Sequence, residues 1–199
     1  GLGDVYKRQG IAARARHPLG GGCEARRHRL DHGRLRGRLA GAGRSAGADA
    51  VTLTPYLGVG SLEPAIELAG EHGKGVFIMA ANSNPEAEAF QSSLIDDRTI
   101  SQYMVDGCAA YNSDSDSGIG HVGHVGVVVG ATVGKPPLLD HLNAPVLMPG
   151  VGAQGATMDD VARIAGAQAR LVFPNVSRSV LSAGPDVGKL RDRAGELAK

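Results

Sequence analysis

Hydrophobic residues beyond residue 46 form short continuous runs that alternate with helical patterns. The runs lie at residues 50–54, 75–80, 125–131, 145–148 and 170–173. Continuous apolar runs of this length are typical of strands that are buried on both faces of a parallel sheet. The pattern therefore predicts five strands, each followed by a helix, in an α/β fold.

Between the runs, apolar positions recur every three or four residues, which indicates amphipathic helices. Ser61 is a candidate N-cap for the first of them, and Thr157 with Asp160 has the spacing of a capping box at the start of another. Gly184 and Pro185 separate the last two helices. A further apolar stripe consists of Ile100, Tyr103, Met104, Cys108 and Tyr111. This alternation fits the later units of a (β/α)8 barrel or one side of a doubly wound sheet, and periodicity alone does not choose between them.

The preceding part of the chain has a different character. Residues 8–44 are dominated by Arg, Gly, Ala and His, with no sustained period of two or 3.6. We therefore expect two regions: residues 1–45, a non-native or poorly ordered stretch, and residues 46–199, the folded part.

Composition excludes several classes of protein. A formal net charge of +1 gives no field that would favour nucleic acid or an anionic membrane as a partner. No apolar run approaches the roughly 18 residues needed to cross a bilayer, so no membrane segment is expected. The two cysteines, Cys23 and Cys108, form neither a disulfide framework nor a metal-binding pair, which favours a reducing cytoplasm.

Four motif-like segments do not survive a check of their context. The G-x-G-x-x-G at residues 118–123 precedes a strand instead of following one, and the segment at residues 130–135 is too short for a Walker A motif. Residues 112–116 resemble a calcium loop without its closing Glu. His121 and His124 would point to opposite faces of a strand. We therefore expect no metal ion and no cofactor.

Two loops after the last predicted strands carry residues suited to an anion. The first begins at Pro149 and contains Gly150, Gln154 and Gly155, so that the backbone can approach a ligand closely. The second contains Arg178, whose guanidinium can form a bidentate pair with a phosphate. Barrels commonly hold phosphate at their last two strands, which links the two loops. The alternative is a glycine-rich turn and an unrelated surface arginine.

Several segments together resemble the bacterial long form of the orotidine 5'-phosphate decarboxylase family. They are residues 51–58, 83–85, 127–134, 149–156 and 174–185. The resemblance implies a (β/α)8 barrel, here incomplete, that converts orotidine 5'-monophosphate to uridine 5'-monophosphate (UMP) and carbon dioxide without a cofactor. It also implies a nucleotide monophosphate as substrate and a homodimer, which is in doubt for this chain because the residues that would form the interface fall in the arginine-rich stretch.

The family pattern assigns roles to particular residues. Ser83 would hydrogen-bond the pyrimidine, Gln154 would bridge the base and the phosphate, and Arg178 would clamp the phosphate. Pro149, Gly150 and Gly155 would line the same substrate site.

The family's catalytic D-x-K-x-x-D motif does not occur in this chain. Its lysine position is occupied by Glu24, and its aspartate positions by Gly22 and Arg27. With one choice of codons, residues 22–32 read in the neighbouring frame as Asp-Ala-Lys-Arg-Gly-Asp-Ile-Gly-Ser-Thr-Met, which is the family's catalytic segment. We therefore hypothesise a frameshift, biological or introduced in sequencing or assembly, that extends to about residue 46. The chain as written is expected to be inactive.

Three other interpretations stay open. Residues 1–9 resemble translated adapter sequence. The basic N-terminal stretch could instead be a genuine arm that binds nucleic acid. The charge of this stretch comes almost wholly from Arg, without interleaved aromatic residues, which disfavours such an arm. The folded part could belong to another phosphate-binding barrel, such as a sugar-phosphate lyase or isomerase. It could also be a non-catalytic barrel fragment that retains only the phosphate loop.

Overall fold

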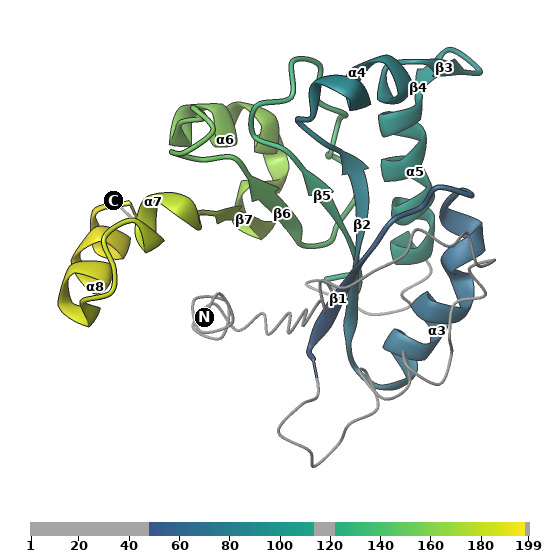
Figure 1. Cartoon of the computed structure of the whole chain (residues 1–199). Coiled ribbons are helices and arrows are strands. Elements are labelled where there is room, and N and C mark those ends of the chain that lie inside the picture. Colours follow the sequence, from purple (N-terminus) through teal and green to yellow (C-terminus); the bar gives the residue numbers. More distant parts are fainter. Residues whose placement is uncertain (1–47, 114–121, 198–199) are drawn as a thin grey trace, which may run out of the picture.

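The computed structural model describes residues 48–113 and 122–197, which form a five-stranded parallel sheet flanked by helices (Figure 1). The strands are β1 (Ala50–Leu53), β2 (Gly75–Ala81), β5 (Val125–Val129), β6 (Val146–Pro149) and β7 (Val172–Asn175). Each strand pairs with the next one along the chain, in the order β1-β2-β5-β6-β7. A doubly wound sheet reverses its strand order at a switch point. The described strands show no such reversal, and they match the barrel alternative.

Helices and one small hairpin lie between or after these strands, and a loop alone joins β5 to β6. They are the 3-10 helices η1 (Val59–Leu62) and η2 (Gly166–Leu171), the helices α3 (Glu63–Glu71), α4 (Pro85–Gln91), α5 (Ile100–Ser113), α6 (Met158–Ala165), α7 (Arg178–Leu181) and α8 (Val187–Glu196), and the two-residue strands β3 (Leu94–Ile95) and β4 (Arg98–Thr99). The hairpin and α5 follow α4, and α7 and α8 extend beyond β7 (Figure 1).

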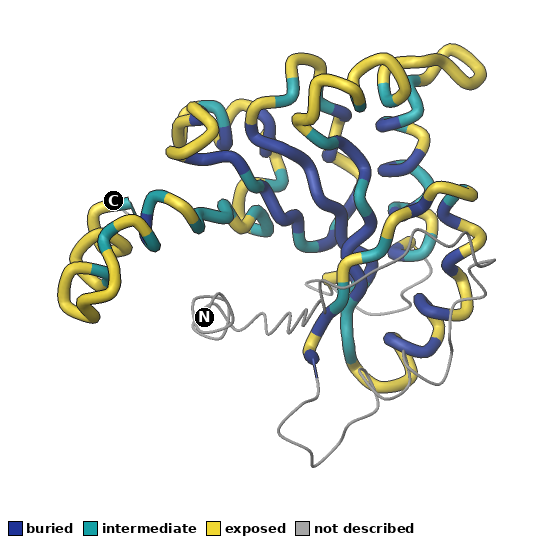
Figure 2. The backbone as a smooth tube through the Cα atoms, viewed as in Figure 1, coloured by how far each residue is buried: buried dark blue, intermediate teal, exposed yellow. Residues whose placement is uncertain are grey.

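The two faces of the sheet are buried to different extents. Alternate residues of the central strands, such as Ile78 and Val127, point into the large core that the sheet forms with α3, α5 and α6. The opposite face carries a smaller cluster of Ala50, Phe77, Val128 and Leu147. The buried central strands and the exposed outer surfaces of the helices are visible in Figure 2. This second face is the one that would line the interior of a barrel.

Strand boundaries follow the prediction closely, with one displacement. The last strand begins at Val172 and not at Arg170, because residues 166–171 form η2. Pro174 is therefore inside β7. A proline is tolerated there because β7 is the edge strand of the described sheet, and no strand on its open side requires a hydrogen bond from a backbone N–H.

Three details of the predicted helices are wrong. No helix follows β5, because residues 130–145 lead to β6 as a loop. Ser61 does not cap α3: its hydroxyl donates to the carbonyl of Gly58 at 2.7 Å, and α3 starts after a 3-10 turn with Leu62 at its N-cap. Tyr103 does not lie on the buried face of α5, since the residue is 40% exposed. The Arg98 guanidinium lies over the Tyr103 ring, 5.7 Å from the centroid.

The buried face of α5 is displaced by about one position from the predicted stripe, and two of its members are polar. Ser101 and Asn112 are buried together with Met104, Val105 and Cys108. The Asn112 amide donates to the carbonyls of Val125 and Leu142 at 3.0 and 2.9 Å, and its oxygen accepts from the Val125 amide at 3.2 Å. These bonds satisfy backbone groups that would otherwise be buried without partners, so a polar residue is stable there.

None of the helices within residues 48–113 and 122–197 combines the length and apolarity needed to cross a membrane.

Candidate functional site at the carboxyl edge of the sheet

The loops that follow β2, β5, β6 and β7 meet at one edge of the sheet because the strands are parallel. Backbone hydrogen bonds continue between these loops beyond the strands. The Gly130 amide donates to the Ala81 carbonyl at 2.9 Å, and the Ala131 amide donates to the Pro149 carbonyl at 2.8 Å. The chain segments that carry the predicted site residues are therefore held in a fixed order along this edge.

Ser83 and Gln154 are in direct contact across this edge. The Ser83 hydroxyl donates to the Gln154 side-chain oxygen at 3.3 Å, although the two residues are 71 positions apart in the sequence. Both side chains are exposed, so each can still reach a ligand. The structure thus brings together two of the predicted substrate-binding residues.

The glycine-rich loop after β6 depends on backbone conformations that favour glycine. Gly150, Gly152 and Gly155 have φ angles of 121°, 76° and 92°. A Cβ at Gly150 would also lie 3.1 Å from the Gln154 side-chain oxygen. Substitution of Gly150 would therefore both strain the backbone and displace the glutamine that contacts Ser83.

Several amides of this loop donate to carbonyls of the loop itself. The Gly152 amide donates to Ala156, the Gly155 amide to Gly152, and the Ala156 amide to Gly150, at 2.9, 2.9 and 3.3 Å. These bonds fix the shape of the turn. They also leave the Gln154 side chain at its exposed tip as the polar group best placed to meet a ligand.

Arg178 lies beside this loop, at the start of the four-residue helix α7. Its neighbour Ser179 approaches Gly152 so closely that a Cβ there would come within 2.7 Å of the Ser179 hydroxyl oxygen. The Arg178 side chain is exposed, at the same edge of the sheet as Gln154. The two loops that were predicted to form an anion site are therefore adjacent.

The helix that follows the glycine-rich loop begins with the predicted capping box. The Thr157 hydroxyl accepts from the Asp160 amide at 3.2 Å, and the Thr157 amide donates to the Asp160 carboxylate at 3.0 Å. The hydrogen bond from the Thr157 backbone is the main reason that the pKa of Asp160 is lowered. This cap fixes where the loop ends and α6 begins.

A cavity of about 130 Å³ lies behind Ser83. It is lined by the turn after β2, by α4, by the start of α5 and by residues 132–135 of the loop after β5. Thr132 and Lys135 are among the lining residues, and sequence reasoning missed both. The only signal was the glycine-lysine spacing that fails as a Walker A motif.

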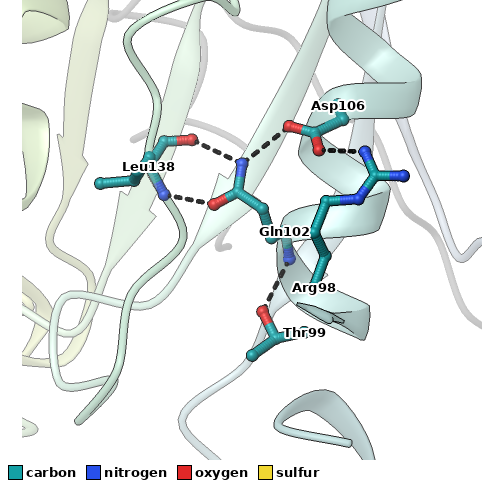
Figure 3. A network of polar contacts seen from close by, with 5 residues as sticks. All are labelled: Arg98, Thr99, Gln102, Asp106 and Leu138. Atoms are coloured by element: carbon teal, nitrogen blue, oxygen red, sulfur yellow. Dashed lines mark hydrogen bonds and ion pairs between the residues drawn. The ribbon is translucent and has the colours of Figure 1, made fainter. Parts of the chain in front are cut away.

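A polar network holds the far end of the loop after β5 against α5 (Figure 3). The Gln102 amide group accepts from the Leu138 backbone N–H at 2.7 Å and donates to the Leu138 carbonyl at 3.2 Å. Gln102 also donates to Asp106 at 2.8 Å, and Asp106 pairs with Arg98 at 2.9 Å. The network thereby ties the hairpin, α5 and this loop into one unit beside the cavity.

Other predicted residues lie elsewhere. The positions assigned to catalysis, Gly22, Glu24 and Arg27, lie outside the described residues, as does His121. The His124 ring nitrogen is 3.3 Å from the Ile66 carbonyl, on the opposite edge of the sheet from Ser83. Within the described part of the chain, no group of three or more His, Cys, Asp or Glu side chains is arranged to hold a metal ion.

Several known proteins resemble this chain in sequence and in fold. The family model described as orotidine 5'-phosphate decarboxylase / HUMPS family matches residues 29–192. Over 152 residues, the chain is 51% identical to an orotidine 5'-phosphate decarboxylase of Corynebacterium glutamicum and 53% identical to one of Corynebacterium efficiens, covering 76% of this chain and 54% of each relative. A crystal structure from Streptomyces avermitilis, provisionally assigned as an orotidine 5'-phosphate decarboxylase, shares 46% identity with a TM-score of 0.68, over 76% of this chain and 52% of that one.

The fold is an incomplete (β/α)8 barrel, of which the described residues supply five consecutive parallel strands. The chain belongs to the orotidine 5'-phosphate decarboxylase / HUMPS family. It spans about half the length of the curated relatives that it matches.

Proposed function

We propose that the protein is an orotidine 5'-phosphate decarboxylase, whose substrate is orotidine 5'-monophosphate and whose products are UMP and carbon dioxide. The observation that carries the proposal is the contact between Ser83 and Gln154, which joins two loops. The family pattern assigns binding of the pyrimidine to Ser83 and the bridge between base and phosphate to Gln154. Arg178 on the adjacent loop supplies the positive charge for the phosphate. The names of the Corynebacterium relatives support the same reaction.

In this family, remote phosphate contacts contribute to the reaction because their binding energy can be used at the reacting carbon. The chemical step itself needs a carboxylate that crowds the substrate carboxylate and a lysine that protonates the carbon left by carbon dioxide. Gly22 and Arg27 provide no carboxylate at the aspartate positions, and Glu24 provides no ammonium group at the lysine position. We therefore propose that the chain as written binds the nucleotide and does not decarboxylate it.

We also propose that residues 1–45 are not native protein sequence. The family match begins at residue 29, after all three positions assigned to catalysis, which supports the proposal for residues 1–28. The match includes residues 29–45, so it gives no support for the rest of this stretch. Resequencing of the coding region tests it: an intact frame that still encodes residues 16–46 as given would refute the frameshift.

Calorimetric titration of the purified chain tests nucleotide binding. UMP should bind more tightly than ribose 5-phosphate, because only UMP offers a base to Ser83 and Gln154. A sugar-phosphate enzyme would bind the two ligands equally or prefer the sugar phosphate, and that result would contradict the proposal.

Substitution of Arg178 tests the phosphate contact. Arg178→Ala should lower the affinity for both ligands about tenfold or more, since hydrogen bonds to charged groups contribute roughly 1.5–3 kcal/mol. Arg170→Ala is the matched control, because it removes the same charge from the exposed segment that precedes β7 instead of the one that follows it. Equal losses in the two variants would indicate a general charge effect and not a phosphate site.

A further inference from the structure

The turn that carries Ser83 is attached to the far end of the helix that follows it. Gln91, the last residue of α4, accepts a hydrogen bond at its side-chain oxygen from the backbone amide of Asn82, at 2.8 Å. Asn82 is the first residue after β2, where the sheet ladder stops, and it immediately precedes Ser83. The Gln91 side chain therefore supplies the partner that this amide needs just where the strand ends.

The turn is confined on its other side by β5. The Gly130 amide donates to the carbonyl of Ala81, the residue before Asn82, at 2.9 Å. A Cβ at Gly130 would lie 3.3 Å from the Ser83 nitrogen and 3.4 Å from the Ser83 Cβ, so the two backbones are in close contact. Residues 81–83 are thus fixed between a side chain of α4 and the backbone of Gly130, directly after β5.

The two side chains differ in what they can reach. Ser83 is exposed and points to Gln154, whereas Gln91 is half-buried and its oxygen is occupied by the Asn82 amide. The residues assigned to the phosphate follow other strands, β6 and β7, and belong to other loops. Loss of the Gln91 oxygen would therefore disturb the base-binding half of the site and leave the phosphate-binding half in place.

We infer that Gln91 is a positioning residue for the pyrimidine: by holding the Asn82 amide, it sets the Ser83 hydroxyl at the place where the base is recognised. This inference rests on the proposed function, because it requires Ser83 to contact the base. In this role Gln91 acts through the turn, by its hydrogen bond to the Asn82 amide.

The test compares two ligands on the full chain, UMP and ribose 5-phosphate, with variants at Gln91. Gln91→Met keeps the length of the side chain and removes the acceptor oxygen. This variant should bind UMP about 5- to 20-fold more weakly, as expected for one lost hydrogen bond. Its affinity for ribose 5-phosphate should stay within about twofold. Gln91→Glu retains an acceptor oxygen and should restore UMP binding.

Gln168→Met is the control, because Gln168 is a glutamine in η2 whose side chain also bonds the backbone, there by donating to the Asp140 carbonyl, away from the site. It should leave both affinities unchanged. If Gln91→Met does not fold by circular dichroism, Gln91→Ala replaces it, since that variant removes the amide without introducing a longer apolar side chain.

The possible outcomes separate the two proposals. An unmodified chain that does not prefer UMP to ribose 5-phosphate overturns the proposed function, and the role of Gln91 with it. A chain that prefers UMP and keeps that preference in Gln91→Met overturns only the role of Gln91. Equal weakening of both ligands would also overturn it, because it would show a general loss of structure.

Discussion

Gly126 is the residue at which the sheet has least room for a side chain. A Cβ at this position would collide with the Pro145 carbonyl oxygen and would lie 2.9 Å from the Phe77 ring. The Pro145 oxygen belongs to the backbone, so it cannot move aside as the end of a flexible side chain can. The smallest possible side chain is therefore already too large between β5 and the neighbouring segments.

Gly126→Ala should lower the free energy of unfolding by about 1–3 kcal/mol, the usual cost of overpacking a filled interior. Urea unfolding followed by circular dichroism measures this difference. Gly60→Ala is the control, because a Cβ added at Gly60 would have no atom within 4 Å, and this variant should change stability by less than about 0.5 kcal/mol. Similar values for the two variants would contradict the close packing around Gly126.

Cys108 connects burial with the response to alkaline pH. Its side chain is fully buried, and burial raises the pKa of the thiol from 9.0 to about 12. In the unfolded chain the thiol ionises at its ordinary pKa, whereas in the folded chain it stays neutral until a higher pH. The contribution to stability is therefore complete below pH 9 and is lost as the pH rises from 9 towards 12.

We expect Cys108→Ala to reduce the loss of stability between pH 9 and pH 11. Urea unfolding of both proteins at pH 7, 9, 10 and 11 measures the difference between their pH profiles, which removes the contribution of lysines and tyrosines common to both. Parallel profiles would show that Cys108 is not the titrating group.

At the scale of single elements, α6 shows a start that sequence can predict. The capping box depends on two residues three positions apart, and Thr157 and Asp160 form it as expected. The lowered pKa of Asp160 means that its carboxylate stabilises the folded state above its ordinary pKa of 3.8, and that this stabilisation is lost as the pH falls through the lowered value.

Asp160→Asn should therefore lower the melting temperature more at pH 7 than at pH 2, because protonation of the carboxylate at low pH removes its stabilising effect in the unmodified chain. Differential scanning calorimetry at the two pH values measures this. Asp159→Asn is the control, because Asp159 is an exposed carboxylate in the same turn that is not part of the capping box. A loss of stability at pH 2 as large as that at pH 7 would contradict the assignment.

Most of the elements that sequence predicted share one property, which is a buried apolar pattern. The exception is α8, which buries none of its residues and was predicted from the boundary at Gly184 and Pro185. The five strands of the sheet are continuous apolar runs, and α3 and α6 bury regular stripes. Helix α4 was missed because it buries none of its residues, and the β3–β4 hairpin because each strand has two residues and the turn places Asp96 and Asp97, instead of glycines, at positive φ.

The candidate site was predictable only in part, for a similar reason. Ser83, Gln154 and Arg178 lie in segments whose residue types and order carry the family resemblance. Gln91 and Gln102 act through side chains that bond the backbone of other segments, and no periodic or motif-like spacing indicates such contacts. Polar residues that position a loop are visible only once the loop and the helix are seen together.

At the scale of the whole molecule, the described sheet ends in two open strands. No strand of the described residues pairs with the outer side of β1 or of β7. Thr52 on β1 is exposed, and Phe173 on β7 is 40% exposed. Open strand edges beside apolar side chains favour association between chains.

We expect the purified chain to self-associate as its concentration rises, and Thr52→Lys to reduce this association, since a charge on an edge strand opposes pairing with another strand. Light scattering over a concentration series measures the change. Ser182→Lys adds the same charge to an exposed position after α7, away from both edges, and should have a smaller effect. An equal reduction by the two variants would attribute the effect to net charge alone.

The hydrogen bond between Ser83 and Gln154 also bears on which molecules the edge would reject. The two groups already satisfy each other, so an arriving base has to take the place of that bond and does not simply add new ones. A base whose polar edge matches both groups loses little in this exchange. One that lacks a matching donor or acceptor would leave a serine and a glutamine without partners beneath it, a penalty of about 1–3 kcal/mol for each such group once it is buried. The site would thus discriminate between bases mainly through the free-energy cost of leaving these two groups unpaired, and less through the strength of the hydrogen bonds to a matching base.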